Sequence, residues 1–223
     1  MIHFLHGFLG TKNEWNIKEN IPNVYNHGLY DLVLNPHARQ ALAHSITLPA
    51  TFIGYSMGGR FWPSFLLSHH ILPEKIILIS AHYGLQNLEQ RKNRKNFEQQ
   101  ILQKLAHSAT SEFLHFWNNL PLFAFDQHKD TLPNESRQTL IDTFEKMQLS
   151  LMDNVLDWLK NLGPRVHFIY GKYDKTYANL AQHLKSLGIK TYEIEGGHRL
   201  IGNPKLNTLL SHILELPHLF GVH

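Results

Sequence analysis

The sequence of 223 residues contains no cysteine, which excludes disulfide bonds, thiolate metal sites and a cysteine nucleophile. It also contains no uninterrupted apolar run of about 18 residues, the length that a membrane-spanning helix needs. Its start, Met-Ile-His-Phe-Leu-His-Gly, has neither the basic region nor the apolar stretch of a signal peptide. These absences predict a cytoplasmic protein with no membrane partner.

Charged side chains are scarce as well. Asp, Glu, Lys and Arg make up 17% of the residues, whereas soluble domains average about 25%. The formal net charge is only +3. The one basic cluster, residues 91–95, lacks interleaved aromatic side chains, so we interpret it mainly as a solvated helix face and expect no nucleic-acid partner.

Apolar side chains, in contrast, make up 43% of the sequence, enough for the core of one domain and too many for a disordered chain. Short apolar runs that resemble buried strands alternate with helical patterns, which predicts an α/β fold with a mostly parallel sheet of about six strands. The expected strands are residues 2–5, 29–34, 51–55, 75–80, 165–170 and 190–194. The expected helices beside them are residues 57–70, 178–187 and 204–214.

Residues 84–162 interrupt this alternation, because they contain no strand-like run. Helical patterns cover residues 87–107, 111–118, 135–148 and 149–161, and Gly163-Pro164 ends the stretch. We expect a helical cap, residues 84–162, inserted before the last two strands of a core made of residues 1–83 and 163–223.

A Gly-x-Ser-x-Gly motif, Gly-Tyr-Ser-Met-Gly at residues 54–58, stands between an expected strand and an expected helix. This is the setting of a nucleophile elbow, in which a tight turn exposes a serine hydroxyl at the end of a strand. The motif predicts that Ser56 is a nucleophile. The alternative is an ordinary glycine-rich turn.

An acid and a base follow the last two expected strands. Asp174 and His198 each come after a strand end, so they are expected on the same edge of the sheet as Ser56. The order Ser, Asp, His is that of α/β-hydrolases. His198 would take the proton of Ser56 and Asp174 would orient the imidazole. Taken singly, Asp174 could be a turn residue and His198 a surface residue.

The segment after the first strand, His6-Gly7-Phe8, is the expected position of one oxyanion donor. The backbone N–H of Phe8 and that of Met57, the residue after the nucleophile, are the candidates. His6 itself is interpreted as a structural hydrogen-bonding group.

Four segments together resemble a known family. They are Leu-His-Gly-Phe-Leu-Gly at 5–10, Gly-Tyr-Ser-Met-Gly-Gly-Arg at 54–60, His-Tyr-Gly-Leu-Gln-Asn at 82–87 and Gly-Gly-His at 196–198. They are similar to the 2-succinyl-6-hydroxy-2,4-cyclohexadiene-1-carboxylate synthases of menaquinone biosynthesis. The resemblance implies the α/β-hydrolase fold and a lyase that eliminates pyruvate from a succinyl-enolpyruvyl-hydroxycyclohexene carboxylate with a Ser-His-Asp triad.

The same resemblance implies a small anionic substrate and no cofactor. It carries four substrate-binding positions over to this chain: Tyr55, Arg60, Arg94 and Trp117. Arg60 also lies one helical turn after Ser56 and could share its face. The plainer alternatives are a solvated arginine for Arg60 and a residue of the cap core for Trp117.

Two features depart from the family pattern. The chain begins at the strand before His6, without the strands that usually precede it. Residues 35–39 are Asn-Pro-His-Ala-Arg, where the family has Asp-x-Pro-Gly-His-Gly. A carboxylic-ester or thioester hydrolase with the same triad therefore remains the alternative, and a non-catalytic binding protein is a third reading. The sequence has 17 histidines but no recognisable ligand pattern, so we expect no metal site. We expect a monomer or a small homo-oligomer.

Overall fold

Six parallel strands form one sheet in the computed structural model, which describes residues 1–19 and 21–221. The strand order is β2-β1-β3-β4-β5-β6. The strands are β1 (Ile2–Leu5), β2 (Val24–His27), β3 (Thr51–Tyr55), β4 (Lys75–Ile79), β5 (Val166–Gly171) and β6 (Lys190–Ile194). The parallel α/β sheet expected from the sequence is confirmed.

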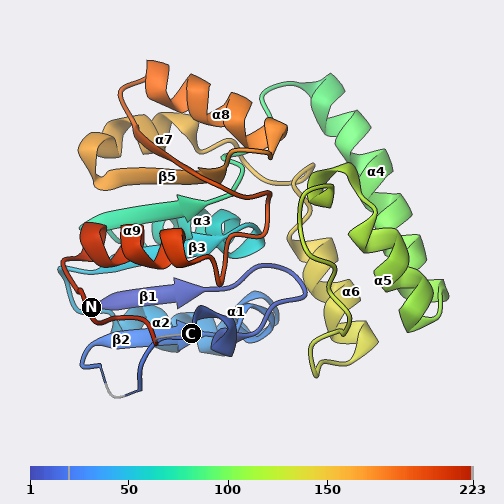
Figure 1. The fold of residues 1–223 in the computed structure, drawn as a ribbon, viewed down its shortest axis with the longest axis horizontal. Coiled ribbons are helices and arrows are strands. Elements are labelled where there is room, and N and C mark those ends of the chain that lie inside the picture. Colours follow the sequence, from blue (N-terminus) through green and yellow to red (C-terminus); the bar gives the residue numbers. More distant parts are fainter. Residues whose placement is uncertain (20, 222–223) are drawn as a thin grey trace.

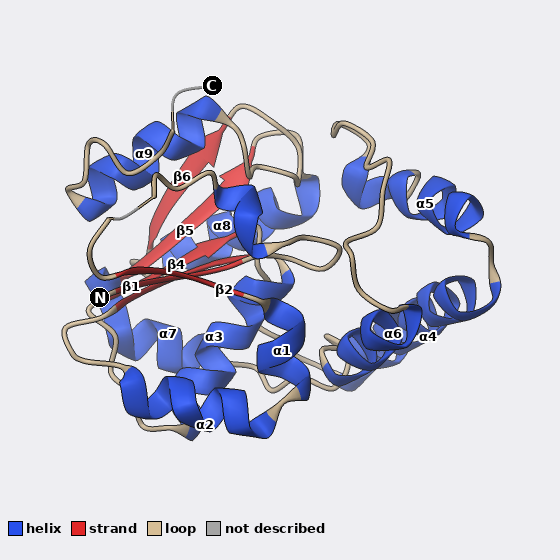
Figure 2. Cartoon of the chain, turned by 90° about the horizontal axis from the view of Figure 1, so that it is seen from below, coloured by secondary structure: helices blue, strands red, loops and turns tan. Residues whose placement is uncertain are grey.

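The central strands are buried on both faces, which explains their continuous apolar sequence. In β4, Ile76 and Leu78 belong to one core cluster, whereas Ile77 and Ile79 belong to the other. Helix α9 (Pro204–Leu214) packs on the second face, and α1, α2, α3 and α7 cover the first (Figure 2). The sheet therefore separates two cores.

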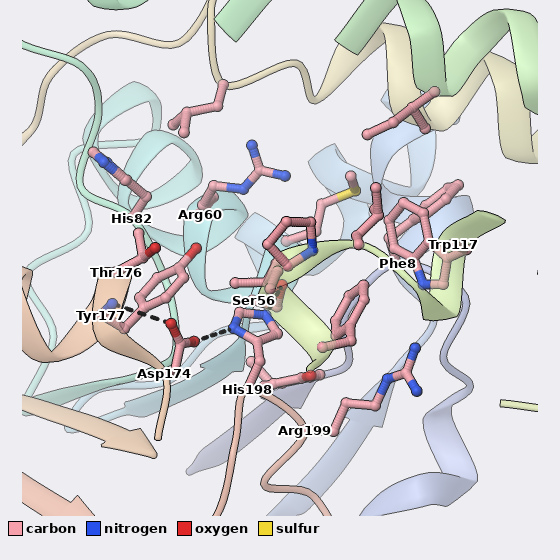
Figure 3. A pocket seen from close by; sticks show the side chains of 18 of the residues that line it. Phe8, Ser56, Arg60, His82, Trp117, Asp174, Thr176, Tyr177, His198 and Arg199 are labelled. Atoms are coloured by element: carbon pink, nitrogen blue, oxygen red, sulfur yellow. Dashed lines mark hydrogen bonds and ion pairs between the residues drawn. The ribbon is translucent and has the colours of Figure 1, made fainter. Parts of the chain in front are cut away.

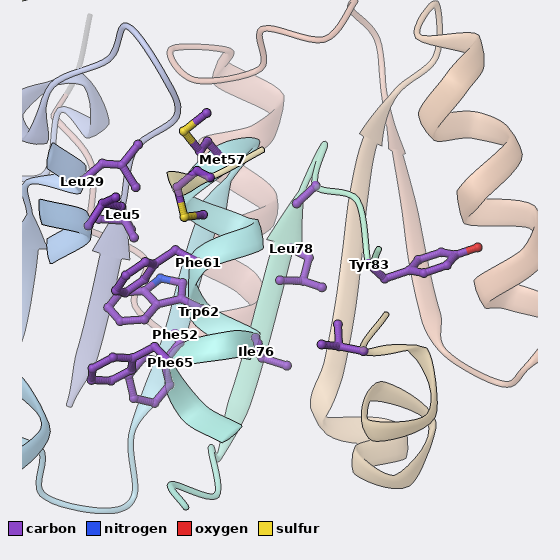
Figure 4. Packing of buried hydrophobic residues seen from close by; sticks show 14 of the residues in the cluster. Leu5, Leu29, Phe52, Met57, Phe61, Trp62, Phe65, Ile76, Leu78 and Tyr83 are labelled. Atoms are coloured by element: carbon purple, nitrogen blue, oxygen red, sulfur yellow. The ribbon is translucent and has the colours of Figure 1, made fainter. Parts of the chain in front are cut away.

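The first core is rich in aromatic side chains near α3 (Met57–Ser68). Phe52 of β3 and Phe65 of α3 both pack against Trp62 (Figure 4). The buried indole N–H of Trp62 donates to the carbonyl of Ile53 at 3.0 Å. These contacts fix the helix that follows Ser56 firmly on the sheet.

The expected strand at residues 29–34 is wrong. These residues form helix α1 (Leu29–Leu34), followed by α2 (Pro36–Ser45), and the strand is the preceding β2. A six-residue apolar run fits a buried helix as well as a strand. The edge strand β2, Val-Tyr-Asn-His, lies partly exposed and so lacks an apolar signature. Asn35 accepts hydrogen bonds from the first N–H groups of α2 and so caps this helix.

Three helices stand beyond the carboxyl ends of the strands: α4 (Leu88–His107), α5 (Thr110–Asn118) and α6 (Arg137–Lys146) (Figure 1). The helix expected over residues 149–161 is shorter, α7 (Leu156–Leu162), and it lies beside β5. The N–H groups of Leu149 and Ser150 bind the Glu98 carboxylate instead of starting a helix. The division into cap and core at residues 84–162 stays a prediction.

The remaining helix of the core, α8 (Lys175–Ser186), begins three residues earlier than the sequence pattern suggested. Its first turn is capped by Asp174, whose side chain accepts from the N–H of Tyr177. Short 3-10 turns occur at Lys12–Trp15, Pro121–Phe123 and Gly163–Arg165. The cap of α8 places Asp174 at the end of the sheet where Ser56 lies.

Candidate active site

Ser56 sits on the sharp turn between β3 and α3. Its φ of 51° lies in the left-handed region, which is unfavourable for a residue with a side chain. The chain can make this turn because the residues two positions before and two positions after Ser56 are glycines. A Cβ at Gly54 would come within 2.5 Å of the Gly59 Cα, and one at Gly58 within 2.4 Å of the His6 carbonyl oxygen. The motif thus forms the elbow that its sequence predicts.

Ser56, His198 and Asp174 lie in line at the end of the sheet (Figure 3). The imidazole Nε2 of His198 is 3.1 Å from the Ser56 Oγ. Its Nδ1 is 2.7 Å from a carboxylate oxygen of Asp174. An Nδ1–H that donates to Asp174 leaves Nε2 free to accept the serine proton. Both His198 and Asp174 are buried, so the carboxylate acts on the imidazole away from solvent.

The backbone next to Ser56 comes from the loop after β1. A Cβ at Gly7 would lie 3.2 Å from the Ser56 Cβ, so Phe8 follows directly beside the serine. Both Phe8 and Met57 line the cavity above it. Their role as oxyanion donors stays a prediction.

His6 holds that loop in place. Its Nε2 accepts from the N–H of Leu29 at 3.0 Å, and its Nδ1 lies 2.8 Å from the Gly7 carbonyl oxygen. Burial lowers the pKa of His6 to about 4, so the ring is neutral at physiological pH. These contacts agree with the structural role expected for His6.

A cavity of about 800 Å³ opens above Ser56, between the sheet and helices α4, α5 and α6. Most of its lining is apolar and aromatic, which suits the ring of a small organic substrate. Its cationic side chains are Arg60, Arg94, Lys129, Lys175 and Arg199, and its anionic ones are Glu14 and Asp174. A cavity with this balance favours an anionic ligand.

Arg60 is a buried guanidinium that faces the cavity (Figure 3). Its Nη1 donates to the carbonyl of Met147 at 2.9 Å, and among the described residues it has no carboxylate partner. Burial, followed by the charge of Arg94, lowers the pKa of Arg60 to about 10. Arg60 therefore keeps its charge at neutral pH and has donors left for a ligand. It is not the solvated arginine that the plainer interpretation expected.

Arg94 also lines the cavity, but part of its guanidinium is used within the protein. Its Nε donates to Glu98 at 2.8 Å, and its guanidinium carbon Cζ lies 5.3 Å from the Phe97 ring centre. The terminal nitrogens remain for the cavity. The structure thus brings both predicted arginines into the cavity that contains Ser56.

The two predicted aromatic residues line the cavity as well. The Tyr55 ring lies 5.6 Å from that of His198, and burial raises the pKa of its hydroxyl well above its ordinary value. The Trp117 ring packs 5.5 Å from Phe8 and 5.3 Å from Phe123. Trp117 is therefore at once a part of the first hydrophobic core and a wall of the cavity.

Sequence reasoning missed several residues at the site. His82 lines the cavity, and its Nδ1 accepts from the N–H of Gly84 at 3.0 Å, so Nε2 carries the proton of the neutral ring. Burial, then the charges of Arg60 and Arg94, lowers the pKa of His82 to about 4. The sequence indicates His82 only as part of the segment that resembles the family. Tyr177, whose ring lies 4.9 Å from that of His198, carried no sequence signal.

No helix in residues 1–19 and 21–221 has the length and apolar character needed to cross a bilayer. In the same residues no three His, Asp or Glu side chains gather as a metal site would require.

No protein-family model matches the chain. A Bacillus subtilis protein provisionally named 2-succinyl-6-hydroxy-2,4-cyclohexadiene-1-carboxylate synthase is 28% identical over 141 residues, which are 55% of this chain and 52% of that protein. The Klebsiella pneumoniae synthase of that name is 24% identical over 202 residues, 81% of this chain and 80% of that protein. This chain thus spans about half the length of the Bacillus relative and 62% of a Haemophilus influenzae relative.

Solved structures show the same fold. MenH from S. aureus has a TM-score of 0.70 and 19% identity, and the match covers 96% of this chain and 92% of that one. A structure described among carboxylesterases of Nitrososphaera gargenis has a TM-score of 0.69 and 17% identity, with 96% of this chain and 89% of that one covered. The chain therefore has the α/β-hydrolase fold, and its sequence resembles 2-succinyl-6-hydroxy-2,4-cyclohexadiene-1-carboxylate synthases.

Proposed function

We propose that this protein is a lyase that eliminates pyruvate from a succinyl-enolpyruvyl-hydroxycyclohexene carboxylate to give 2-succinyl-6-hydroxy-2,4-cyclohexadiene-1-carboxylate. The observation that carries the proposal is the buried Arg60 guanidinium, without a carboxylate partner in the described chain, in the cavity that contains Ser56 and His198. The relatives named as this synthase support it.

In this reaction the Ser56–His198 pair acts as a base. His198 Nε2 takes the proton of the Ser56 hydroxyl, and Ser56 Oγ removes the proton from the ring carbon next to the succinyl carbonyl. The electron pair moves into the ring and the bond to the enolpyruvyl oxygen breaks. The enolpyruvate leaving group takes up one proton and becomes pyruvate, and His198 gives up the proton it holds, so that no net proton is gained or lost.

The other residues predicted for the site would bind the substrate and stabilise the charge that develops on it. The N–H groups of Phe8 and Met57 would stabilise the negative charge that develops on the succinyl carbonyl oxygen. Arg60 and Arg94 would hold carboxylates of the substrate. Tyr55 and Trp117 would pack against its ring.

The alternative is a carboxylic-ester or thioester hydrolase. The same Ser56, His198 and Asp174 would serve it, and the neighbour described among carboxylesterases supports it nearly as well by fold. In that reaction Ser56 attacks the ester carbonyl, an acyl group remains on Ser56, and water then releases it. The two proposals differ in whether a covalent intermediate forms.

One experiment separates them. The purified protein is mixed with the cyclohexene adduct, pyruvate is followed with lactate dehydrogenase, and quenched samples are weighed by intact mass spectrometry. The lyase gives stoichiometric pyruvate and no covalent intermediate on the protein, and Ser56→Ala loses this activity. A mass increase on Ser56 during turnover of the cyclohexene substrate would exclude the lyase. The hydrolase would be established if a short acyl ester is hydrolysed with burst kinetics and the cyclohexene substrate releases no pyruvate.

A further inference from the structure

We propose that Asp126 is a positioning residue for His198, an inference that rests on the proposed role of His198 as the base. Asp126 follows the 3-10 turn Pro121–Phe123, far from His198 in the sequence. Its carboxylate accepts from the backbone N–H of His198 at 3.0 Å and from that of Arg199 at 2.9 Å. Both oxygens of the carboxylate thus bind the main chain that carries the histidine.

The loop after β6, which carries His198, depends on these two hydrogen bonds. It begins with Gly196 and Gly197, which have no side chains to pack. A Cβ at Gly197 would lie 2.4 Å from an oxygen of Asp126, so the carboxylate can approach only because this residue is glycine. No other acceptor in the described chain binds the N–H of His198 or of Arg199. Without Asp126, both N–H groups would lose their partner.

Arg199 ties the same loop to the same segment a second time. Its guanidinium donates to the carbonyl of Gln127 and, at 2.9 Å, to the side-chain oxygen of Asn118. It lies 4.1 Å from the ring centre of Phe123, which in turn lies 5.5 Å from the ring centre of His198. The main chain of His198 is therefore held from the segment between α5 and α6.

This arrangement determines where the imidazole lies. The hydrogen bonds of His198 to Ser56 and Asp174, 3.1 and 2.7 Å long, depend on the position of its main chain. A displacement of about 1 Å in a reacting group can cost about 100-fold in rate. Asp126 is not among the described residues that line the cavity, so its loss should slow the reaction of Ser56 without removing a contact to the substrate.

The test is the rate at which diisopropyl fluorophosphate phosphorylates Ser56 with loss of fluoride, because this small neutral probe needs Ser56 and His198 but no carboxylate-binding arginine. We expect Asp126→Ala to slow labelling by about 10- to 100-fold. Asp126→Asn should lie between Asp126→Ala and the wild type, since its one oxygen can still accept from one N–H. Asp130→Ala, which removes an exposed carboxylate from the same segment, is the matched control and should label at the wild-type rate.

Each outcome decides one question. If the folded wild-type protein is not labelled at Ser56, the proposed active site fails, whatever Asp126 does. If the wild type is labelled but Asp126→Ala reacts equally fast, the positioning role is overturned. Should Asp126→Ala fail to fold, the near-isosteric Asp126→Asn decides, and an unchanged rate overturns the proposal. With the cyclohexene substrate, the positioning role predicts a lower kcat at an unchanged KM, and a rise in KM alone would contradict it.

Discussion

Arg60 and Arg94 are the residues through which the cavity would recognise charge. We expect Arg60→Ala and Arg94→Ala each to raise the KM for the polycarboxylate substrate, because each removes charge-assisted hydrogen bonds. The loss should be about 1.5–3 kcal/mol, or about 10- to 150-fold. Steady-state kinetics with pyruvate detection measures it.

Lys95→Ala is the control for these variants, since Lys95 is an exposed cation on α4, one residue after Arg94. It should leave KM unchanged. Phosphorylation of Ser56 by diisopropyl fluorophosphate should also be unaffected by Arg60→Ala and Arg94→Ala. If both arginine variants bind the anionic substrate as the wild type does, the cavity recognises something other than carboxylates.

At the level of single residues, local pattern and chain order predicted that Ser56, Asp174 and His198 lie together, and the distances between them agree. Each follows a strand end, and parallel strands end at one edge of the sheet. Asp126 could not be found in this way. It lies 72 positions before His198 in the sequence, and no local motif predicts that the turn carrying it packs against the histidine.

Helix α4 and the segment after α6 are joined by one buried carboxylate. Glu98 accepts from the N–H of Leu149 at 2.7 Å, from the N–H and hydroxyl of Ser150, and from Arg94. We expect Glu98→Ala to destabilise the protein by about 3–5 kcal/mol, because it leaves buried donors and a cation unpaired. Urea unfolding followed by circular dichroism measures the loss.

Two further variants show whether the hydrogen bonds are responsible. Glu98→Gln keeps one acceptor oxygen and should cost less than Glu98→Ala. Glu89→Ala removes an exposed carboxylate from the same helix and should change the free energy of unfolding little. Equal stability of Glu98→Ala and Glu89→Ala would show that the two elements are held together by other contacts.

The buried strands of the sheet could be predicted from the sequence, whereas the edge strand β2 could not, for a physical reason. The strands β1, β3, β4 and β5 are almost wholly buried and mostly apolar, because both faces of the sheet are covered there. The edge strand β2 has one of its long sides unpaired and carries Asn26 and His27, so its sequence resembled a loop. The neighbouring α1 took its place in the prediction because six apolar residues do not distinguish a strand from a short buried helix.

The whole molecule contains several histidines that stay neutral because they are buried. Burial lowers the pKa of His3 to about 3 and that of His6 to about 4, and both side chains are 1% exposed. In the unfolded chain each has a pKa near about 6.5. Between these values the unfolded state binds protons that the folded state cannot, so the free energy of unfolding falls as the pH falls.

The stability of the protein should therefore be nearly constant above pH 7 and fall steeply below about 6.5. Each of these two histidines contributes about 1.4 kcal/mol per pH unit in this range, because protonation costs the folded state but not the unfolded one. Urea unfolding at pH values between 8 and 5 gives the slope. His3→Phe should reduce it by about 1.4 kcal/mol per pH unit, since a phenyl ring fits the stack in which the His3 ring lies 5.0 Å from Phe52. His37→Phe, at an exposed position, should leave the slope unchanged. A slope that is the same in His3→Phe and the wild type would mean that other groups take up the protons on acid unfolding.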